Sequence, residues 1–379
     1  MKLLYVATDQ VVPGTTGGSV HVLEVARGLA RLGHEVHAVV RREGGAPPHE
    51  QSDGVHWHRV RWTPPHRFFR FRARKAVEAL ADDLRPQAVM ERYYNFGGEG
   101  ILTAQGRGLP SVLEVNSPIV DHPRSLKAAL DAALVVRPLR RYRERLCRAA
   151  SALVSPLPEI VPASARDKTR RVTWGADVDS FHPQRRSDAR RAELGVPADG
   201  TAVVFAGSFR PWHGVHVLED AARRLAHRPD IVFLLAGGDR AAAGDGYHGR
   251  RLGRLPHARM PELLASCDIG VAPYDTARLR QLQLGFYWSP LKVFEYMASG
   301  LPTVTIARDP LTEIVRGGQE GLHVPEADAA ALAAAIERLA GDPAGRERLG
   351  LCARARVVEL YSWERHCRQL EALLRELVA

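Results

Sequence analysis

The sequence predicts an α/β protein with two domains, each built on a parallel sheet covered by helices. Runs of β-branched residues are repeatedly followed by segments whose apolar residues lie three and four positions apart. This alternation is typical of strands joined by crossover helices. It occurs twice along 379 residues, which is longer than one hydrophobic core usually serves. Two domains of ordinary size are therefore expected.

The first half of the chain holds enough candidate strands for one doubly wound sheet. They are expected at residues 2–8, 35–40, 54–60, 88–92, 110–115 and 151–155. One face of a helix between the first two is marked by Val22, Val25, Ala26, Leu29 and Leu32. Gly33 follows that helix, at a position where a left-handed cap costs glycine little.

The second half repeats the order of elements. Strands are expected at residues 201–207, 231–238, 268–274 and 301–307, with a helix from about 213 to 226 after the first. Residues 172–183 are rich in turn formers and end in proline, so they predict the connection between domains 1–183 and 184–360. A final helix within 361–379 is predicted by a leucine stripe: Leu370, Leu373, Leu374 and Leu377.

Composition narrows the class of partner. The formal net charge of +10 favours anions such as nucleotide diphosphates or phospholipid head groups. Nucleic acid is not expected, because no reader motif is recognisable and the basic residues are scattered. Four widely spaced cysteines form no metal or disulfide pattern, and neither a signal peptide nor a span of about 18 apolar residues is seen. A cytoplasmic protein is expected.

The stretch from Arg67 to Lys75, RFFRFRARK, leaves two interpretations open. Its arginines and phenylalanines suit peripheral contact with an anionic membrane at the inner face. Alternatively it is a solvated helix start whose phenylalanines pack inward.

Three loops combine glycine or basic residues with a following helix. Gly17 and Gly18 lie in a glycine-rich loop after the first strand, where free amides and the helix dipole favour an anion. The loop is not GxGxxG, which disfavours a nicotinamide site, and a plain flexible turn is the alternative. In the second half, Gly207-Ser208-Phe209-Arg210-Pro211-Trp212-His213-Gly214 follows a strand in the same way. Arg210 there suits phosphate oxygens, and His213 is expected to donate a hydrogen bond nearby.

The third loop is the most informative. A helix is predicted to begin near Pro290, with Lys292 in its first turn and Glu295 one turn later. A lysine beside a helix N-terminus is electrostatically misplaced unless an anion binds there. The carboxylate one turn away suits the paired hydroxyls of a ribose. An exposed Lys/Glu pair on a helix face is the alternative interpretation.

Taken together, these segments resemble the family-4 retaining glycosyltransferases of the GT-B fold. The resemblance rests on the two loops above, the block Ser-Pro-Leu-Lys-Val-Phe-Glu-Tyr-Met-Ala-Ser-Gly-Leu-Pro (289–302) and the closing Tyr-Ser-Trp-Glu segment, in the family's order. It implies two Rossmann-like domains facing across a cleft, and a terminal helix that crosses back to the first domain. It also implies transfer of a sugar, with retention, from a nucleotide-diphosphate donor to a hydroxyl of a polysaccharide, glycolipid or natural product.

The resemblance assigns site residues position by position. Donor binding is implied for Gly17, Gly18, Gly207, Ser208, Arg210, His213, Ser289, Pro290, Leu291, Lys292, Val293 and Glu295. A catalytic position is implied for Asn116, and Arg210 with Lys292 is hypothesised to replace the family's basic pair. Asp121 and His122 lie just beyond Asn116 on the same loop and are further candidates, with a polar surface loop as the alternative. Asn116 stands where many relatives have a histidine and cannot relay a proton. Without an evident nucleophile, a front-face substitution is expected, in which the leaving phosphate accepts the acceptor's proton.

The chain departs from the family pattern in two places. Tyr287 replaces the first glutamate of the Glu-x7-Glu motif, and Ser208 and His213 replace the usual basic pair. A nucleotide-sugar epimerase, a phosphorylase or a degenerate sugar-binding relative therefore remain as alternatives.

No cofactor or metal is expected to be required. Asp177-Val178-Asp179 spells a DxD motif but lies in the connecting segment. His56 and His58 share a strand face without an apparent third zinc ligand.

Overall fold

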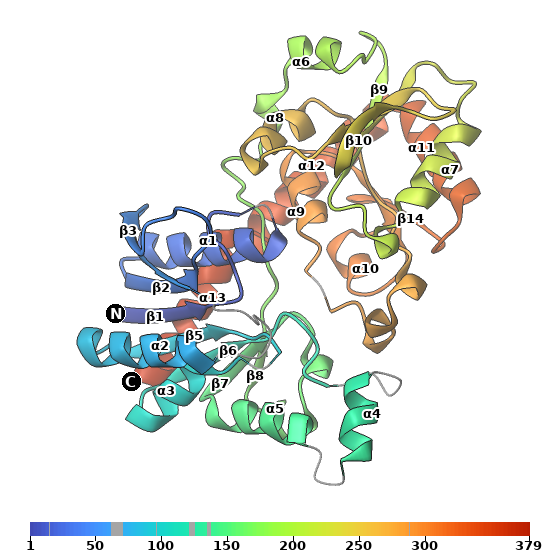
Figure 1. Cartoon of the computed structure of the whole chain (residues 1–379). Coiled ribbons are helices and arrows are strands. Elements are labelled where there is room, and N and C mark those ends of the chain that lie inside the picture. Colours follow the sequence, from blue (N-terminus) through green and yellow to red (C-terminus); the bar gives the residue numbers. More distant parts are fainter. Residues whose placement is uncertain (15, 62–70, 96, 121–125, 135–137, 288) are drawn as a thin grey trace. The chain divides into compact units, whose positions relative to one another are not determined.

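The computed structural model describes residues 1–14, 16–61, 71–95, 97–120, 126–134, 138–287 and 289–379. These residues divide into two units (Figure 1). Unit 1 comprises Met1–Trp174, Tyr287–Ser289 and Trp363–Ala379, and unit 2 comprises Gly175–Phe286 and Pro290–Ser362. The chain thus first passes between units at Trp174–Gly175, earlier in the turn-rich segment than the expected position near residue 183.

Unit 1 contains an eight-stranded sheet in the order β3-β4-β2-β1-β5-β6-β7-β8. The strands are β1 Lys2–Ala7, β2 Glu35–Arg41, β3 His49–Ser52, β4 Val55–Val60, β5 Ala88–Arg92, β6 Ser111–Glu114, β7 Ala152–Ser155 and β8 Thr169–Arg171. Every recorded strand pair is parallel except β3 with β4. The helices of this unit are α1 Gly17–Arg31, α2 Phe71–Leu84, α3 Glu99–Arg107, α4 Leu126–Ala133, α5 Pro138–Ala149 and α13 Trp363–Val378.

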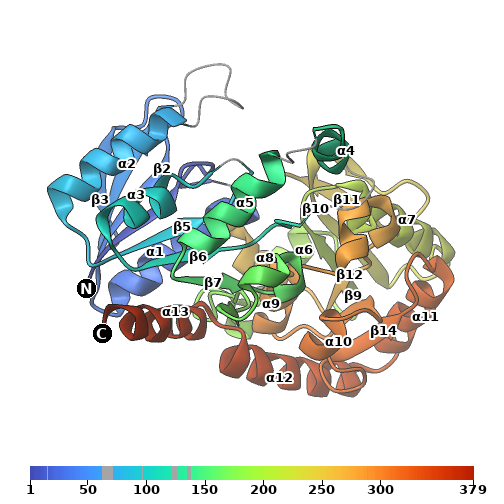
Figure 2. The ribbon, with the colours of Figure 1, turned by 90° about the horizontal axis from the view of Figure 1, so that it is seen from below.

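Helices cover both faces of this sheet. In Figure 2, α2, α3 and α5 lie on one face, and α1 and α13 lie together on the other. Thr16 caps α1 by accepting a hydrogen bond from the Ser19 amide, and Gly33 has φ of 86° just beyond the helix end. The predicted helix end at Gly33 and the crossing of the terminal helix to the first unit are confirmed.

Unit 2 contains a six-stranded sheet in the order β11-β10-β9-β12-β13-β14, with parallel neighbours. The strands are β9 Thr201–Ala206, β10 Ile231–Ala243, β11 Gly249–Gly253, β12 Ile269–Ala272, β13 Thr303–Ile306 and β14 Gly321–Val324. The helices are α6 Asp188–Glu193, α7 Val215–Arg224, α8 Met260–Ala265, α9 Leu291–Ala298, α10 Leu311–Ile314, α11 Ala329–Ala340 and α12 Pro343–Leu360. One core packs α7 and α11 on the sheet, while α9 packs with α12.

The structure also bears on the membrane and cysteine expectations. Of the basic stretch from Arg67 to Lys75, residues 67–70, including Phe68 and Phe69, lie outside the described residues, and residues 71–75 begin α2. Across the described ranges, no helix combines the length and apolarity needed to cross a bilayer. All four cysteines are free thiols, and Cys367 is buried against α1.

The contact of α13 with α1 depends on the absence of a side chain at Gly28. A Cβ added to Gly28 would overlap Sγ of Cys367, so Gly28→Ala must separate the two helices. We expect this variant to lose about 1–3 kcal/mol of unfolding free energy, measured by urea denaturation. Gly106→Ala is the control, because Gly106 is exposed in α3 and a Cβ there meets nothing within 4 Å. It should gain up to about 1 kcal/mol from helix propensity, and equal losses in both variants would contradict the packing argument.

Candidate functional site

In unit 2, the loop after β9 and the first turn of α9 meet at Gly207 and Lys292. Gly207 has φ of 146°, and a Cβ built there would lie 2.8 Å from Nζ of Lys292. Only a glycine at this position leaves room for the lysine. The sequence therefore brings together two segments that lie 85 residues apart.

Lys292 holds its ammonium group without an acceptor. Nζ lies 4.1 Å from the ring centroid of Phe205 and 5.3 Å from that of Tyr274, and no hydrogen-bond partner is found among the described residues. Burial lowers the pKa of Lys292 to about 7, while Glu295 acts in the opposite direction. Aromatic faces stabilise a cation only partly, so this group is poised to receive an anion.

His213 is neutral and serves the loop itself. Its Nδ1 lies against the carbonyl oxygen of Ser208, which can only accept, so Nδ1 carries the proton. Burial and then Lys292 lower the pKa of His213 to about 2, and the bond to Ser208 opposes them. The second ring nitrogen, Nε2, is then an acceptor. His213 therefore donates its hydrogen bond within the loop itself, and its role in donor binding stays a prediction.

Arg210 is the other basic side chain on this loop. It precedes the short 3₁₀ turn Pro211–His213 and is exposed, and no hydrogen bond or ion pair of its guanidinium is recorded with the described residues. Its charge contributes to lowering the pKa of His213, after burial and Lys292. Arg210 thus lies near His213 and is available to a ligand.

Not every residue of the predicted donor-binding segment from Ser289 to Val293 has a backbone amide that a ligand could use. Pro290 has no N–H, and the Val293 amide donates to the Pro290 carbonyl at 2.8 Å. Leu291 and Lys292 keep amides without a recorded intrahelical acceptor, as expected for a helix start. Ser289 belongs to unit 1, where its hydroxyl accepts a hydrogen bond from the Trp174 amide at 3.1 Å.

Glu295 has a partner that the sequence does not reveal. Its Oε1 lies 3.0 Å from Nε2 of His257, and the carboxylate is largely buried. His257 comes from a separate short turn, His257–Arg259, so no spacing rule links it with α9. The pair fixes one oxygen of the carboxylate close to the lysine-bearing turn.

Unit 1 places Gly17, Gly18 and Asn116 at the carboxyl ends of its strands. Gly17 and Gly18 form the first turn of α1, and a Cβ on Gly18 would contact Gln10 and Arg92. Asn116 follows β6, and its Oδ1 accepts a hydrogen bond from Trp174 Nε1 at 3.0 Å. Its buried Nδ2 has no partner among the described residues and remains a free donor.

Two further predicted residues cannot be placed. Asp121 and His122 lie outside the described residues. Tyr287, the replacement for the first motif glutamate, is buried, and burial raises its pKa to about 12.

The two doubtful metal motifs have structural explanations. Asp177 Oδ1 accepts hydrogen bonds from the amides of Asp179 and Ser180, which fixes a turn. His58 hydrogen-bonds to His37 at 3.0 Å and to His49 at 3.1 Å, from neighbouring strands. Sequence spacing missed His37 and His49 because strand pairing, which brings them together, is not local.

Comparison with known proteins agrees with this architecture. A sucrose-phosphate synthase from Thermosynechococcus elongatus superposes with a TM-score of 0.76 at 22% identity, covering 99% of this chain and 98% of that one. Anabaena HepE, solved with UDP and glucose, gives a TM-score of 0.71 at 17% identity over the full length of both chains. A D-inositol 3-phosphate glycosyltransferase from a Nocardioides species is 28% identical, over 95% of this chain and 85% of the relative.

The two sheets and the returning helix define the GT-B fold. Family models match over most of the chain: the "Glycosyl transferase 4-like domain" over residues 16–173 and "Glycosyl transferases group 1" over residues 200–342. The chain belongs to this family of glycosyltransferases.

Because the ammonium of Lys292 is buried without an acceptor among the described residues, we expect the unfolding free energy to depend on pH. Below pH 7 both folded and unfolded chains hold the proton, so burial of the charge opposes folding fully. Between pH 7 and the ordinary lysine value of 10.5, only the unfolded chain keeps it, and wild-type stability rises with pH. Lys292→Met should therefore be more stable than wild type at pH 6.5, by a margin that shrinks towards pH 10.

Thermal unfolding at a series of pH values measures this margin. Lys75→Met is the control, since Lys75 is exposed on α2 and should show no such trend. A margin for Lys292→Met that is independent of pH would show that the lysine is not buried as a free cation.

Proposed function

We propose that this protein transfers a sugar from a UDP-type donor to a hydroxyl acceptor, with retention, by front-face substitution. The observation that carries the proposal is the ammonium of Lys292, which is buried without an acceptor among the described residues. The amides of Leu291 and Lys292 have no recorded acceptor in the same part of the chain, and Arg210 is exposed on the neighbouring loop. A diphosphate would supply the negative charge that this arrangement lacks. Binding of UDP by the structurally similar HepE supports the same class of ligand.

Each part of the site has a chemical task in this reaction. Lys292, the amides of Leu291 and Lys292, and Arg210 would bind the phosphate oxygens and stabilise the charge that develops on the leaving group. The Glu295 carboxylate would accept hydrogen bonds from the ribose hydroxyls. Asn116 has no proton to transfer, so its role would be to orient a sugar or acceptor hydroxyl. It would do so by donating a hydrogen bond from Nδ2, which has no partner among the described residues.

The bond changes need no enzyme base. The bond between the anomeric carbon and the phosphate oxygen breaks, and the acceptor oxygen bonds to the same carbon on the same face. The acceptor's proton moves to the departing phosphate oxygen, so UDP leaves with the proton. Positioning and charge stabilisation are then the protein's contributions.

The donor and the reaction class are tested together by a screen of nucleotide sugars, read by release of nucleoside diphosphate. Addition of a hydroxyl acceptor should increase release, and no added metal ion should be needed. Dependence on inorganic phosphate would indicate a phosphorylase, and conversion of the nucleotide sugar without an acceptor would indicate an epimerase. Absence of any nucleotide-dependent thermal stabilisation would indicate a degenerate binding site.

Removing either basic side chain should weaken binding of UDP. Lys292→Ala and Arg210→Ala each delete a charged partner of phosphate, which corresponds to about tenfold or more in Kd by calorimetry. Arg348→Ala, at an exposed position on α12, is the matched control and should bind normally. If both site variants bind UDP as tightly as wild type, the phosphate assignment is wrong.

The proposed contact of Glu295 with the ribose is tested by comparing nucleotides with and without the 2′-hydroxyl. Wild type should prefer UDP over 2′-deoxy-UDP by about tenfold, and Glu295→Ala should bind the two nucleotides alike. His257→Ala removes the neighbouring partner but leaves the carboxylate, so the preference should persist. A preference that survives in Glu295→Ala would assign the ribose to another group.

A further inference from the structure

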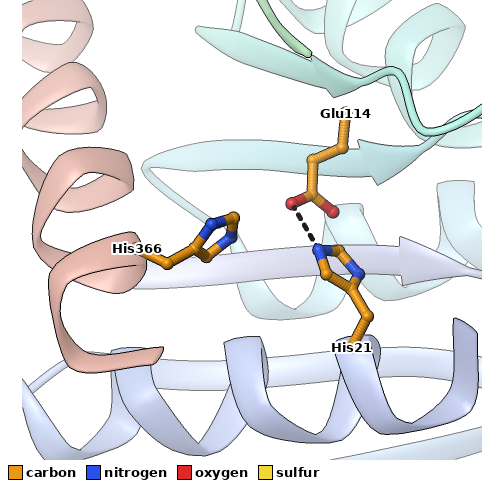
Figure 3. Close-up of side chains that lie close together, drawn as sticks. All are labelled: His21, Glu114 and His366. Atoms are coloured by element: carbon orange, nitrogen blue, oxygen red, sulfur yellow. Dashed lines mark ion pairs between the residues drawn. The ribbon is translucent and has the colours of Figure 1, made fainter. Parts of the chain in front are cut away.

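A buried cluster in unit 1 has the chemistry of a metal site and takes no part in the proposed transfer. His21 comes from α1, Glu114 from the end of β6, and His366 from α13 (Figure 3). One ligand atom of each side chain lies within 4.8 Å of the others. The three residues are 0%, 1% and 3% exposed. Groups far apart in the sequence thus point their polar atoms at one small volume.

Two of the side chains are already held by neighbours that leave an electron pair free. The Tyr5 hydroxyl donates to Glu114 Oε2 at 2.6 Å, so the other oxygen, Oε1, faces the cluster. His366 Nδ1 lies 2.8 Å from the carbonyl oxygen of Thr173 and must donate to it. Nε2 of His366 is therefore an unprotonated acceptor, and it has no partner among the described residues. A hydrogen bond from the other ring nitrogen to a backbone carbonyl orients many metal-binding histidines in this way.

His21 has fewer hydrogen-bond partners than Glu114 or His366. Neither of its ring nitrogens has a hydrogen-bond partner in the described part of the chain, although both are buried. Its Nε2 lies 3.6 Å from Glu114 Oε1, too far for a hydrogen bond. The Trp174 ring stacks on the imidazole at 4.5 Å between centroids, and Trp363 meets its edge at 5.7 Å. Packing against the two tryptophans thus fixes the position of the ring, while both of its nitrogens lack hydrogen-bond partners among the described residues.

The separations suit a first-row transition metal. Bonds of 2.0–2.2 Å arranged tetrahedrally place ligand atoms roughly 3.3–3.6 Å apart, close to the separation of His21 Nε2 from Glu114 Oε1. Two imidazoles and one carboxylate are borderline ligands of the kind that zinc takes, whereas Mg²⁺ and Ca²⁺ take oxygen. We propose that His21, Glu114 and His366 bind one zinc ion, which ties α13 to α1 and β6.

The role of the ion would be structural. The three ligands come from three elements of one unit, and the tryptophans around them restrict access by substrate. Loss of the ion would leave one buried nitrogen each of His21 and His366 without a partner among the described residues. The sugar transfer would still need no metal at the diphosphate.

The test begins with the full-length protein after removal of any affinity tag. Elemental analysis should find about one zinc per chain, or one should bind after chelator treatment and return of Zn²⁺, raising the melting temperature. Cobalt in its place should give visible d–d absorption, and X-ray absorption should show two imidazoles and one carboxylate oxygen. Wild-type protein that neither retains nor rebinds zinc overturns the proposal, whatever the variants do.

Variants then locate the ion. His366→Ala and Glu114→Gln should each lower zinc content at least tenfold, and Glu114→Gln can keep the hydrogen bond from Tyr5. His58→Ala is the matched control, because His58 belongs to the other imidazole group, on β4. Zinc lost from His58→Ala but kept by His366→Ala would assign the ion to the sheet edge and refute the site. If the cluster variants do not fold, the ligand set seen by X-ray absorption of wild type decides.

Discussion

The burial of one positive charge without a counter-charge is the constraint on which the organisation of unit 2 depends. The ammonium of Lys292 reaches between the rings of Phe205 and Tyr274 and ends beside Gly207. A folded protein keeps such a group only where something other than stability is gained. The glycine after β9, the neutral His213 and the open first turn of α9 all follow from accommodating that charge. A carboxylate at this position would stabilise the unit but would occupy the place that we propose for a diphosphate.

Much of the fold follows from local patterns. The inner strands β1, β2, β5 and β9 and the helix α1 stand within a few residues of where β-branched runs and helical periodicity predict them. The edge strands β3, β8, β11 and β14 escape prediction, because none of them contains a run of β-branched residues. They form because a neighbouring strand offers free hydrogen-bonding groups, which is a property of the assembled sheet.

The candidate site likewise has some residues that local sequence predicts and others that only the tertiary structure reveals. Lys292, Glu295 and Arg210 are visible in the sequence because each is chemically conspicuous next to a predicted helix start. The hydrogen-bond partners that determine the roles of these residues cannot be predicted from the sequence. His257 reaches Glu295 from 38 residues away, and the tautomer of His213 is set by the carbonyl of Ser208. The charge state and orientation of a side chain depend on partners that only tertiary structure supplies, so residue types can be predicted where their roles cannot.

The place of α13 has a consequence for how the chain is made. This helix packs on α1 in unit 1, yet the ribosome synthesises it after the whole of unit 2. The first 174 residues are therefore synthesised before the helix that packs on α1, whereas every element of unit 2 precedes α13 in the chain. While unit 2 is being made, α1 lacks its partner helix, and unit 1 cannot complete this packing until α13 has left the ribosome.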